Sequence, residues 1–320
     1  MRKSTSIILI CLLSISLYNC ANNGKKTTPI ETNNKSQSYF SWTNQGIQFK
    51  ASKNVFLGKL LGHNQFIRFS NLSDIATIEN DVYILDENIL YQSVLKNDAL
   101  VLKASHGFNE YSPSILAVTK ESIFLIDNTS HALIMLDKSN FKELNKLQLP
   151  VNKSCSDMYW DVENNQILMT FPHVQKIYAY DIQKTTFAIY PINTPLYLPV
   201  AITKDNAGET YLVDALMREI VVSSKDGKIK TIFGSYDTVP GSFTFPKGIE
   251  IASDGIVFIT DEVSGTIQLF NENGALLIVE SLGEHLSMPS ACAFTADSHL
   301  IVLDRGLNTV NVYHYEVMEP

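Results

Sequence analysis

The chain has little of several residue types, and each shortage narrows its structural class. Glycine and proline together supply 26 of the 320 residues, below the usual ~12%, which argues against collagen-like and low-complexity chains. Four cysteines are too few for a disulfide framework. Lys and Arg number 25 against 33 Asp and Glu, a formal net charge of -8. Because a nucleic-acid surface is polyanionic, we predict no nucleic-acid partner.

The common catalytic motifs are also missing. The sequence contains no Cys-x-x-Cys-His, no Gly-x-Ser-x-Gly, no His-Glu-x-x-His, no phosphate-binding Gly-Lys-Ser/Thr loop and no EF-hand. The sequence therefore offers no strong signal for a particular reaction.

What the chain does contain favours a β protein. Its 320 residues, 45% of them hydrophobic, are enough for one large core or two ordinary ones. Phe, Tyr and Trp supply 32 residues, and aromatic side chains fit pleated, half-buried surfaces.

The N-terminus carries a targeting signal. Arg2 and Lys3 precede an apolar stretch over residues 7–17, which is shorter than the ~20 residues of a permanent membrane helix. The following Leu17-Tyr18-Asn19-Cys20 resembles the lipobox of bacterial lipoproteins, and Asn before the Cys is similar to the looser lipoboxes of spirochaetes. The resemblance implies cleavage before Cys20 and acylation of that cysteine; an ordinary secretory signal or an uncleaved anchor is the alternative. Cleavage would change the formal charge from -8 to -10, because residues 1–19 hold two basic and no acidic residues.

Three segments are expected. Residues 1–19 form the lipoprotein signal peptide, and residues 20–45, rich in Asn, Lys, Thr and Ser, form a lipidated, flexible tether. Residues 46–320 form the folded domain. We predict a protein anchored by its N-terminal lipid in the bacterial cell envelope, at the outer membrane, facing the periplasm or the exterior.

One period runs through the folded domain. Short apolar runs end at residues 86, 127, 170, 214, 261 and 304, with spacings of 41, 43, 44, 47 and 43 residues. Each run is preceded by one further apolar segment and followed by one or two. Units of ~40 to 47 residues made of four short strands are typical of propeller blades. The sequence predicts an all-β fold, a six-bladed β-propeller of four-stranded antiparallel blades.

The sixth unit lacks its outer strand. A missing strand would leave an unpaired sheet edge, and the segment 54–62 precedes the first complete unit without another role. We predict that this N-terminal segment closes blade six, with 65–69 as the alternative.

The fifth unit resembles an NHL repeat. It has Phe243-Thr244-Phe245-Pro246-Lys247-Gly248, then Asp254-Gly255, then a strand ending in Thr260-Asp261, then Asn273-Gly274. The units at 197–234 and 288–315 are further matches, whereas those at 70–104, 111–149 and 153–191 are eroded, with Thr170 where Asp is expected. The resemblance implies the propeller fold; NHL propellers include scaffolds, binding modules and a few enzymes.

Five aspartates recur at the end of the second strand of a unit, at 86, 127, 214, 261 and 304. Because a catalytic group has no reason to recur in every blade, we interpret them as acceptors for backbone N–H groups of their turns.

Charged residues near the starts of the inner strands are the candidate ligand-binding residues. They are Asp74, Asp157, Arg218, Lys247 and Arg305. We expect them at the mouth of the central channel, where they would bind a polar ligand or stand as solvated loop ends. Cys155 and Cys292 are expected on opposite sides of the ring as buried, unpaired thiols.

Three histidines, His63, His106 and His285, fall in connections between outer and inner strands. Neutral imidazoles there could hold a divalent metal, and the resemblance permits it, because some propeller lyases with NHL-like blades bind zinc near the channel. No two of these histidines show tight ligand spacing, so we predict no cofactor, with a divalent metal as the alternative.

We therefore predict a monomeric binding module without catalytic activity, which takes a protein or a small polar ligand on its loop face. The alternatives are a metal-dependent lyase, lactonase or hydrolase acting in the channel, and an assembly subunit of an envelope complex.

Overall fold

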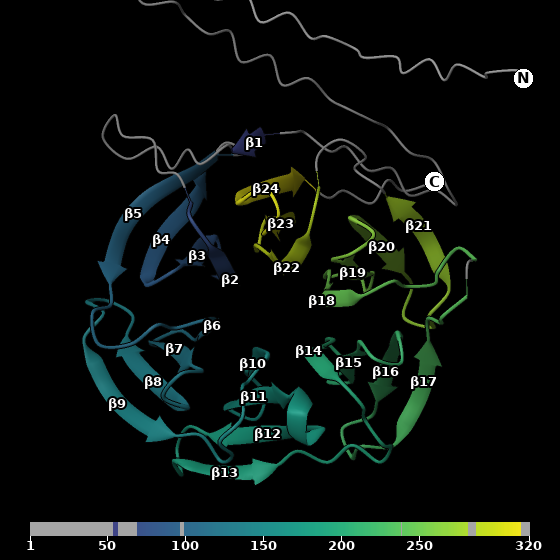
Figure 1. The fold of residues 1–320 in the computed structure, drawn as a ribbon, viewed down its shortest axis with the longest axis horizontal. Helices are drawn as coiled ribbons and strands as arrows, with labels where there is room; N and C mark the ends of the chain where they lie inside the picture. Colours follow the sequence, from purple (N-terminus) through teal and green to yellow (C-terminus); the bar gives the residue numbers. More distant parts are fainter. Residues whose placement is uncertain (1–53, 57–68, 97–98, 238, 281–285, 315–320) are drawn as a thin grey trace, which may run out of the picture. The chain divides into compact units, whose positions relative to one another are not determined.

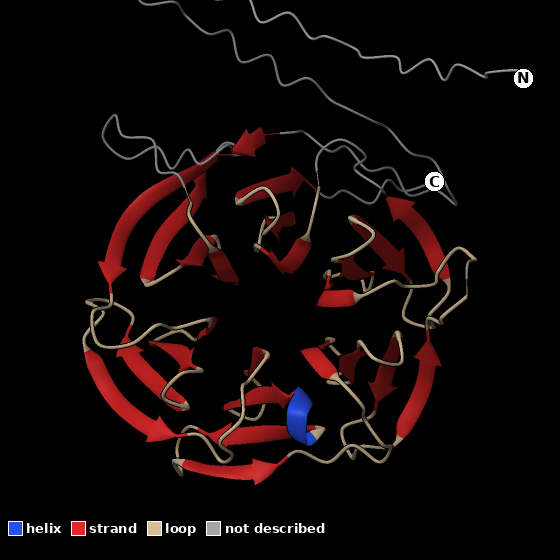
Figure 2. Ribbon diagram, in the orientation of Figure 1, coloured by secondary structure: helices blue, strands red, loops and turns tan. Residues whose placement is uncertain are grey.

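The computed structural model describes residues 54–56, 69–96, 99–237, 239–280 and 286–314. The predicted signal peptide and tether lie outside these residues. The described chain is almost entirely β, with one single-turn 3₁₀ helix at Pro172–Val174 (Figure 2). No helix in the described part has the length and apolar character needed to cross a membrane.

The strands form six four-stranded antiparallel sheets around a central axis (Figure 1), so the predicted fold class is confirmed. The innermost strands are β2 (Leu72–Ile78), β6 (Ile115–Val118), β10 (Asp157–Asp161), β14 (Pro199–Lys204), β18 (Pro246–Ile251) and β22 (Pro289–Phe294). The second strands are β3 (Asp81–Asp86), β7 (Ser122–Asp127), β11 (Gln166–Phe171), β15 (Thr210–Asp214), β19 (Val257–Asp261) and β23 (His299–Asp304). The third strands are β4 (Ile89–Lys96), β8 (Ala132–Asp137), β12 (Lys176–Asp181), β16 (Glu219–Ser223), β20 (Thr266–Phe270) and β24 (Thr309–His314). The outermost strands are β5 (Ala99–Gly107), β9 (Glu143–Gln148), β13 (Thr186–Ile189), β17 (Ile229–Phe233), β21 (Leu276–Glu280) and β1 (Asn54–Phe56).

The ring is closed by the N-terminal segment, as predicted. Strand β1 pairs antiparallel with β24, with Val55 opposite Asn311, and thereby supplies the outer strand of blade six. Blade one also contacts blade six directly, since the Thr77 hydroxyl donates to the Phe294 carbonyl at 2.5 Å. The two ends of the folded domain therefore share one sheet.

The core consists of six apolar clusters, one between each pair of neighbouring blades. Strand β3 shows how the sequence produces this arrangement. Val82 and Ile84 pack towards blade six, whereas Tyr83 and Leu85 pack towards blade two. Because both faces of each blade are buried, the second strands are continuous apolar runs rather than alternating ones.

The recurring aspartates accept backbone hydrogen bonds. Four of the five accept from their own turns, as interpreted, whereas the backbone bonds of Asp86 in the described structure come from Ser70 N and Asn71 N before its inner strand. Asp304 accepts from Ser287 N at 2.6 Å and Met288 N at 3.0 Å, just before the inner strand of its blade, and from Leu307 N in its own turn. Asp86, Asp214 and Asp261 likewise accept from backbone N–H groups just before the inner strand of their blades. Asp127 differs, because its backbone bonds in the described structure come from Thr129 N and Ser130 N of its own turn.

Blade three has no aspartate at this position, and the prediction placed the end of its second strand one residue too early. The position equivalent to these aspartates is Phe171, which lies opposite Lys176, as Asp214 lies opposite Glu219 in blade four. Thr170 is therefore the penultimate residue of its strand, and this blade has no aspartate at its entry.

Candidate site in the central channel

Every inner strand begins with the same irregularity, which directs one residue towards the channel. In blades one, four, five and six the register shifts by one residue at the strand start. In blade two, Ser114 N donates to the carbonyl of Ile126, which already pairs with the next residue, Ile115. In blade three, Ser156 N donates to the carbonyl of Thr170, which already pairs with Asp157. Two residues thus oppose one, which is a β-bulge.

The six bulged residues form the mouth of the channel. They are Ser73, Ser114, Ser156, Val200, Lys247 and Ser290, and all line one cavity of about 520 Å³. Four hydroxyls and one ammonium make this ring polar. The volume falls within the usual range of ~300 to 1,000 Å³ for small-molecule sites.

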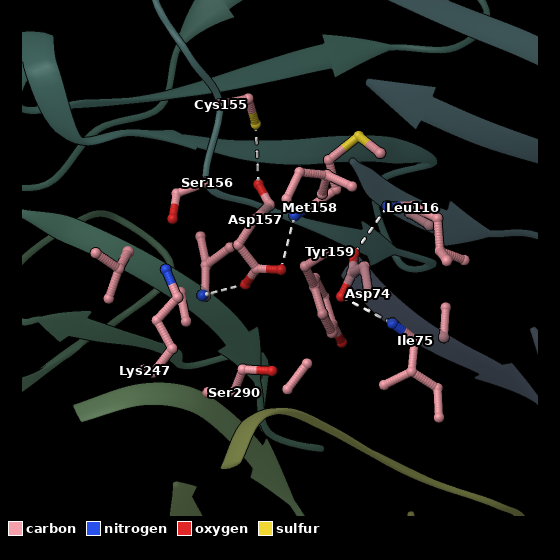
Figure 3. A pocket seen from close by; sticks show the side chains of 18 of the residues that line it. Asp74, Ile75, Leu116, Cys155, Ser156, Asp157, Met158, Tyr159, Lys247 and Ser290 are labelled. Carbon is pink, nitrogen blue, oxygen red and sulfur yellow. Dashed lines mark hydrogen bonds between the residues drawn. The ribbon is translucent and has the colours of Figure 1, made fainter. Parts of the chain in front are cut away.

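Two aspartates lie one position further along the inner strands. Asp74 accepts from Ile75 N at 2.9 Å and from Leu116 N of blade two at 2.8 Å. The carboxylate is therefore bidentate and joins the inner strands of blades one and two (Figure 3).

Asp157 repeats this arrangement between blades three and four. It accepts from Met158 N at 2.8 Å and from Ile202 N at 2.8 Å (Figure 3). Each oxygen takes one N–H group, so a protonated Asp157 would still have one O–H donor and one acceptor position for a ligand.

Burial sets the protonation of these acids. Desolvation raises the pKa of Asp74 to about 7, although hydrogen bonds from Leu116 N and Ile75 N act against the shift. Desolvation, with the negative charge of Asp74 as the next cause, raises the pKa of Asp157 well above its ordinary value. Deeper in the cavity, desolvation raises the pKa of Glu250 to about 8. The cavity therefore holds three carboxyl groups that keep protons at higher pH than usual.

Two cations belong to the same site. Lys247 and Arg305 line the cavity, and Figure 3 shows the Lys247 side chain beside Asp157 and Ser290. Desolvation lowers the pKa of Lys247, and the positive charge of Arg305 adds to this shift, although the negative charge of Glu262 acts against it. No ion pair to either cation occurs within the described ranges. Both charges are available to a ligand.

Four of the five predicted ligand-binding residues, Asp74, Asp157, Lys247 and Arg305, share the cavity. Arg218 is elsewhere: it has φ of 56° in the turn after β15, and its guanidinium lies over the Tyr236 ring at 4.6 Å. Arg218 does not line the cavity, contrary to expectation, because it stands at the end of its turn, four residues after Asp214, whereas Arg305 directly follows Asp304. The binding role of the other four stays a prediction.

The predicted metal ligands are not brought together in the described structure. His106 lies in β5, the outermost strand of blade one, and stacks on Phe141 with ring centroids 5.5 Å apart. It was expected in a connection, but β5 continues through residue 107 and places it on the rim. His63 and His285 lie outside the described residues. Within the described part of the chain, no group of three His, Cys, Asp or Glu side chains has metal-binding geometry.

Cys155 and Cys292, the two cysteines of the described residues, are free and line the same cavity. Desolvation raises the pKa of each thiol, so neither is an activated nucleophile. Cys155 is buried as expected, whereas Cys292 is only half-buried because it borders the cavity.

The four bulged serines differ in how clearly the sequence marks them. Ser114 and Ser290 each follow a proline that precedes an apolar run, whereas Ser73 and Ser156 have no such mark and are recognised only from the register. Asn128 was also missed: its amide donates to Ser114 Oγ at 2.9 Å and accepts from Cys155 N at 2.8 Å, which joins blades two and three at the mouth.

Comparison with known proteins supports the fold alone. No family model matches the chain, and no curated protein matches its sequence. Among solved structures, a streptogramin B lyase is similar with a TM-score of 0.58 and 13% identity, covering 82% of this chain and 97% of that one. A structural genomics protein of unknown function from Bacteroides thetaiotaomicron has a TM-score of 0.61 and 14% identity over 80% of this chain and 72% of its own. The hydrazine synthase of Kuenenia stuttgartiensis has a TM-score of 0.58 and 9% identity over 81% of this chain and all of its own. The chain is thus a six-bladed β-propeller whose neighbours include enzymes and a protein of unknown function.

Proposed function

We propose that this propeller is a binding module whose site for a small polar ligand is the central cavity. The observation that carries the proposal is the convergence of Asp74, Asp157, Lys247 and Arg305 on one cavity of about 520 Å³. Clefts of this size with a few convergent polar groups are the usual ligand sites of proteins. The catalytic motifs absent from the sequence make binding without chemistry the simplest use of the site.

A cavity-filling variant tests this proposal. Ser156 is half-buried at the mouth, so Ser156→Trp fills the cavity from its entrance. The full-length wild-type chain, incubated with a small-molecule extract and reisolated, is expected to retain compounds that Ser156→Trp does not. Ser253→Trp is the matched control, because Ser253 is exposed in the turn between β18 and β19. Equal retention by all three proteins would contradict the proposal.

An enzyme acting in the same cavity is the second candidate. Asp74 favours it, since a carboxyl with a pKa of about 7 exchanges protons near neutral pH. If the protein is a lyase, lactonase or hydrolase, the compounds recovered from the wild type should have an altered mass. The compounds recovered from Asp74→Asn should have an unaltered mass. The metal-dependent form of this candidate requires about one equivalent of zinc or another divalent ion in protein purified without chelator.

We further propose that the chain is a lipoprotein of the bacterial cell envelope, anchored through Cys20. The basic n-region, the short apolar stretch and the Cys at its end support this assignment. Metabolic labelling with an alkyne fatty acid is expected to mark the wild type but not Cys20→Ser. Label on both proteins would exclude Cys20 as the acylation site.

The loop face is also the expected surface for a protein partner, and the unbound chain is expected to be a monomer. Native mass measurement of detergent extracts separates a monomer from an assembly subunit. A complex of several times the monomer mass would favour the assembly role.

A further inference from the structure

The two channel aspartates lie in alternate blades of the ring, and the third alternate blade has no aspartate at the equivalent position. Asp74 belongs to blade one and Asp157 to blade three. The equivalent residue of blade five is Gly248, which lies opposite Thr260 as Asp157 lies opposite Thr170. Two of three alternate blades therefore carry a carboxylate at this level, and the third carries none.

Because blade five has no carboxylate at this position, two backbone N–H groups lack the carboxylate partner that the equivalent N–H groups of blades one to four have. In blades one to four, the residue after the Asp74-equivalent position donates its backbone N–H to one of the two aspartates. Ile75 and Leu116 donate to Asp74, and Met158 and Ile202 donate to Asp157. Ile249 and Cys292 hold the same register in blades five and six. Their N–H groups face the channel by this equivalence, and no carboxylate of the described residues accepts from them.

Several groups beside the gap between blades five and six suit an anion, and the nearby acid Glu250 has its pKa raised by desolvation to about 8. Lys247 directly precedes Gly248, and Arg305 lines the same cavity. Ser290 is 5% exposed, and its buried hydroxyl has no hydrogen-bond partner in the described structure. A buried hydroxyl without a partner costs about 1 to 3 kcal/mol, so an acceptor that reaches it gains by binding there.

The chain cannot supply this carboxylate from Gly248. A Cβ atom at Gly248 would lie 2.9 Å from the Ser290 carbonyl oxygen and 2.9 Å from Thr260 Oγ1. Both distances are shorter than ordinary contacts, so no side chain fits without movement of blade six. Gly248, Ile249, Ser290 and Cys292 all line the cavity, so a group from outside can approach this position from the cavity.

We propose that a carboxylate of the ligand occupies this gap, where it bridges blades five and six as Asp74 and Asp157 bridge their own pairs. Its two oxygens accept from Ile249 N and Cys292 N, while Lys247 and Ser290 supply further donors. This inference rests on the proposed binding function and names the class of its ligand as carboxylic acids.

The test compares three small probes that differ in charge. Succinate carries carboxylates, succinamide is its neutral isostere, and 1,4-diaminobutane is its cationic counterpart. Trp160 lines the cavity, and the chain has two tryptophans, so the full chain with Trp42→Phe reports binding through Trp160 fluorescence alone. Succinate is expected to bind at about millimolar concentration, as suits so small a ligand, and succinamide at least about tenfold more weakly.

Variants locate the bound group. Lys247→Met is expected to weaken succinate binding about tenfold or more, since a charged hydrogen bond is worth ~1.5 to 3 kcal/mol. Lys228→Met is the matched control, because Lys228 lies on an exposed turn and pairs only with Asp226; it should leave succinate binding unchanged. If Lys247→Met does not fold, Ser290→Ala replaces it, with a smaller expected loss of about threefold to tenfold.

Several results would overturn the inference. Equal affinity for succinate and succinamide, binding of the diamine in place of succinate, or unchanged succinate affinity in Lys247→Met would each exclude a carboxylate site here, while cavity binding itself would stand. No response to any probe, together with equal retention of extract compounds by wild type and Ser156→Trp, would overturn the proposed binding function as well. No response to succinate with selective retention of other compounds would overturn only the carboxylate.

Discussion

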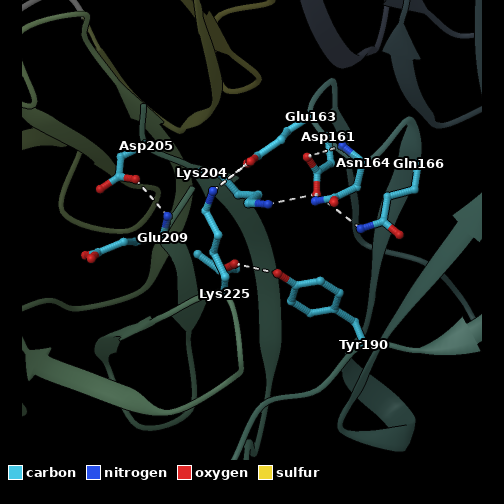
Figure 4. Close-up of polar contacts among 10 residues, drawn as sticks. Asp161, Glu163, Asn164, Gln166, Tyr190, Lys204, Asp205, Glu209 and Lys225 are labelled. Carbon is cyan, nitrogen blue, oxygen red and sulfur yellow. Dashed lines mark hydrogen bonds and ion pairs between the residues drawn. The ribbon is translucent and has the colours of Figure 1, made fainter. Parts of the chain in front are cut away.

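A buried ion pair joins blades three and four, and its removal should cost more stability than any surface pair. Lys204 Nζ lies 2.8 Å from Asp161 Oδ2, and the two side chains are 4% and 3% exposed. Asp161 also accepts from Asn164 and Gln166 (Figure 4). Lys204 ends β14 and Asp161 ends β10, so the pair holds two inner strands together at the end of the channel opposite the bulges.

Lys204→Met keeps most of the side-chain volume and removes the charge. Breaking a buried pair by deleting one partner costs about 3 to 5 kcal/mol, because the other charge is left buried. Asn164 and Gln166 still donate to Asp161 in the variant, so we expect the lower end, about 3 kcal/mol. Lys228→Met removes the exposed Lys228–Asp226 pair and should cost less than ~1 kcal/mol.

The assay is urea unfolding followed by fluorescence, performed on wild type, Lys204→Met, Asp161→Asn and the double variant. Removing both charges leaves no uncompensated ion, so the double variant should lose clearly less than the sum of the single losses, by about 2 kcal/mol. A coupling energy below ~0.5 kcal/mol would refute the reasoning.

The pH dependence of the same variants gives an independent check. Burial alone would raise the pKa of Asp161, but hydrogen bonds from Lys204, Asn164 and Gln166 and the charge of Lys204 outweigh it and lower the pKa. A lowered pKa contributes stability above the ordinary value of 3.8, and this contribution is lost as the pH falls through the folded-state value. The difference between wild type and Lys204→Met should therefore be largest at neutral pH and shrink below about pH 4.

Two further predictions concern the channel acid and a pair of glycines. The raised pKa of Asp74, about 7 against an ordinary 3.8, should make wild-type stability fall as pH rises from about 4 to 7, by at most ~4 kcal/mol. Asp74→Asn should flatten this slope in a urea-midpoint series, and an unchanged slope would assign it to other groups. Gly274→Ala should cost about 2 to 3 kcal/mol, because φ is 77° and a Cβ would lie 2.6 Å from the Phe233 ring. Gly255→Ala, with φ of 87° and open space, should cost only ~1 kcal/mol in thermal unfolding, and equal losses would show that the ring contact is unimportant.

The blade repeat could be predicted because each second strand is buried on both faces. A run such as Val82–Leu85 must be apolar at every position, since alternate residues enter different interblade clusters. The closing role of 54–56 followed from counting strands. Blade three was misread by one residue because its entry aspartate is replaced by Phe171, which removed the polar residue that marks the strand end elsewhere.

The candidate site was only partly predictable, since bulges have no clear sequence signal. The residues before inner strands could be named, but which of two neighbours faces the channel depends on the register shift. Arg218 shows a second reason why the site was only partly predictable. It lies four residues after Asp214, whereas Arg305 directly follows the equivalent Asp304. Its guanidinium lies over the Tyr236 ring at 4.6 Å, a contact between residues of different loops.

Different pairs of blades contribute different groups to the cavity. Blades one and three supply Asp74 and Asp157, whereas blades five and six supply Lys247 and the turn of Arg305. Gly248 allows the close approach of blade six, because a Cβ atom there would lie 2.9 Å from the Ser290 carbonyl oxygen. Asp74 and Asp157 hold the same position in their own blades and tie the neighbouring blade by side-chain hydrogen bonds instead. The exchange of aspartate for glycine at this level therefore leaves two blade pairs bridged by a carboxylate and a third pair, beside Lys247, Arg305 and the acid Glu250, without such a bridge.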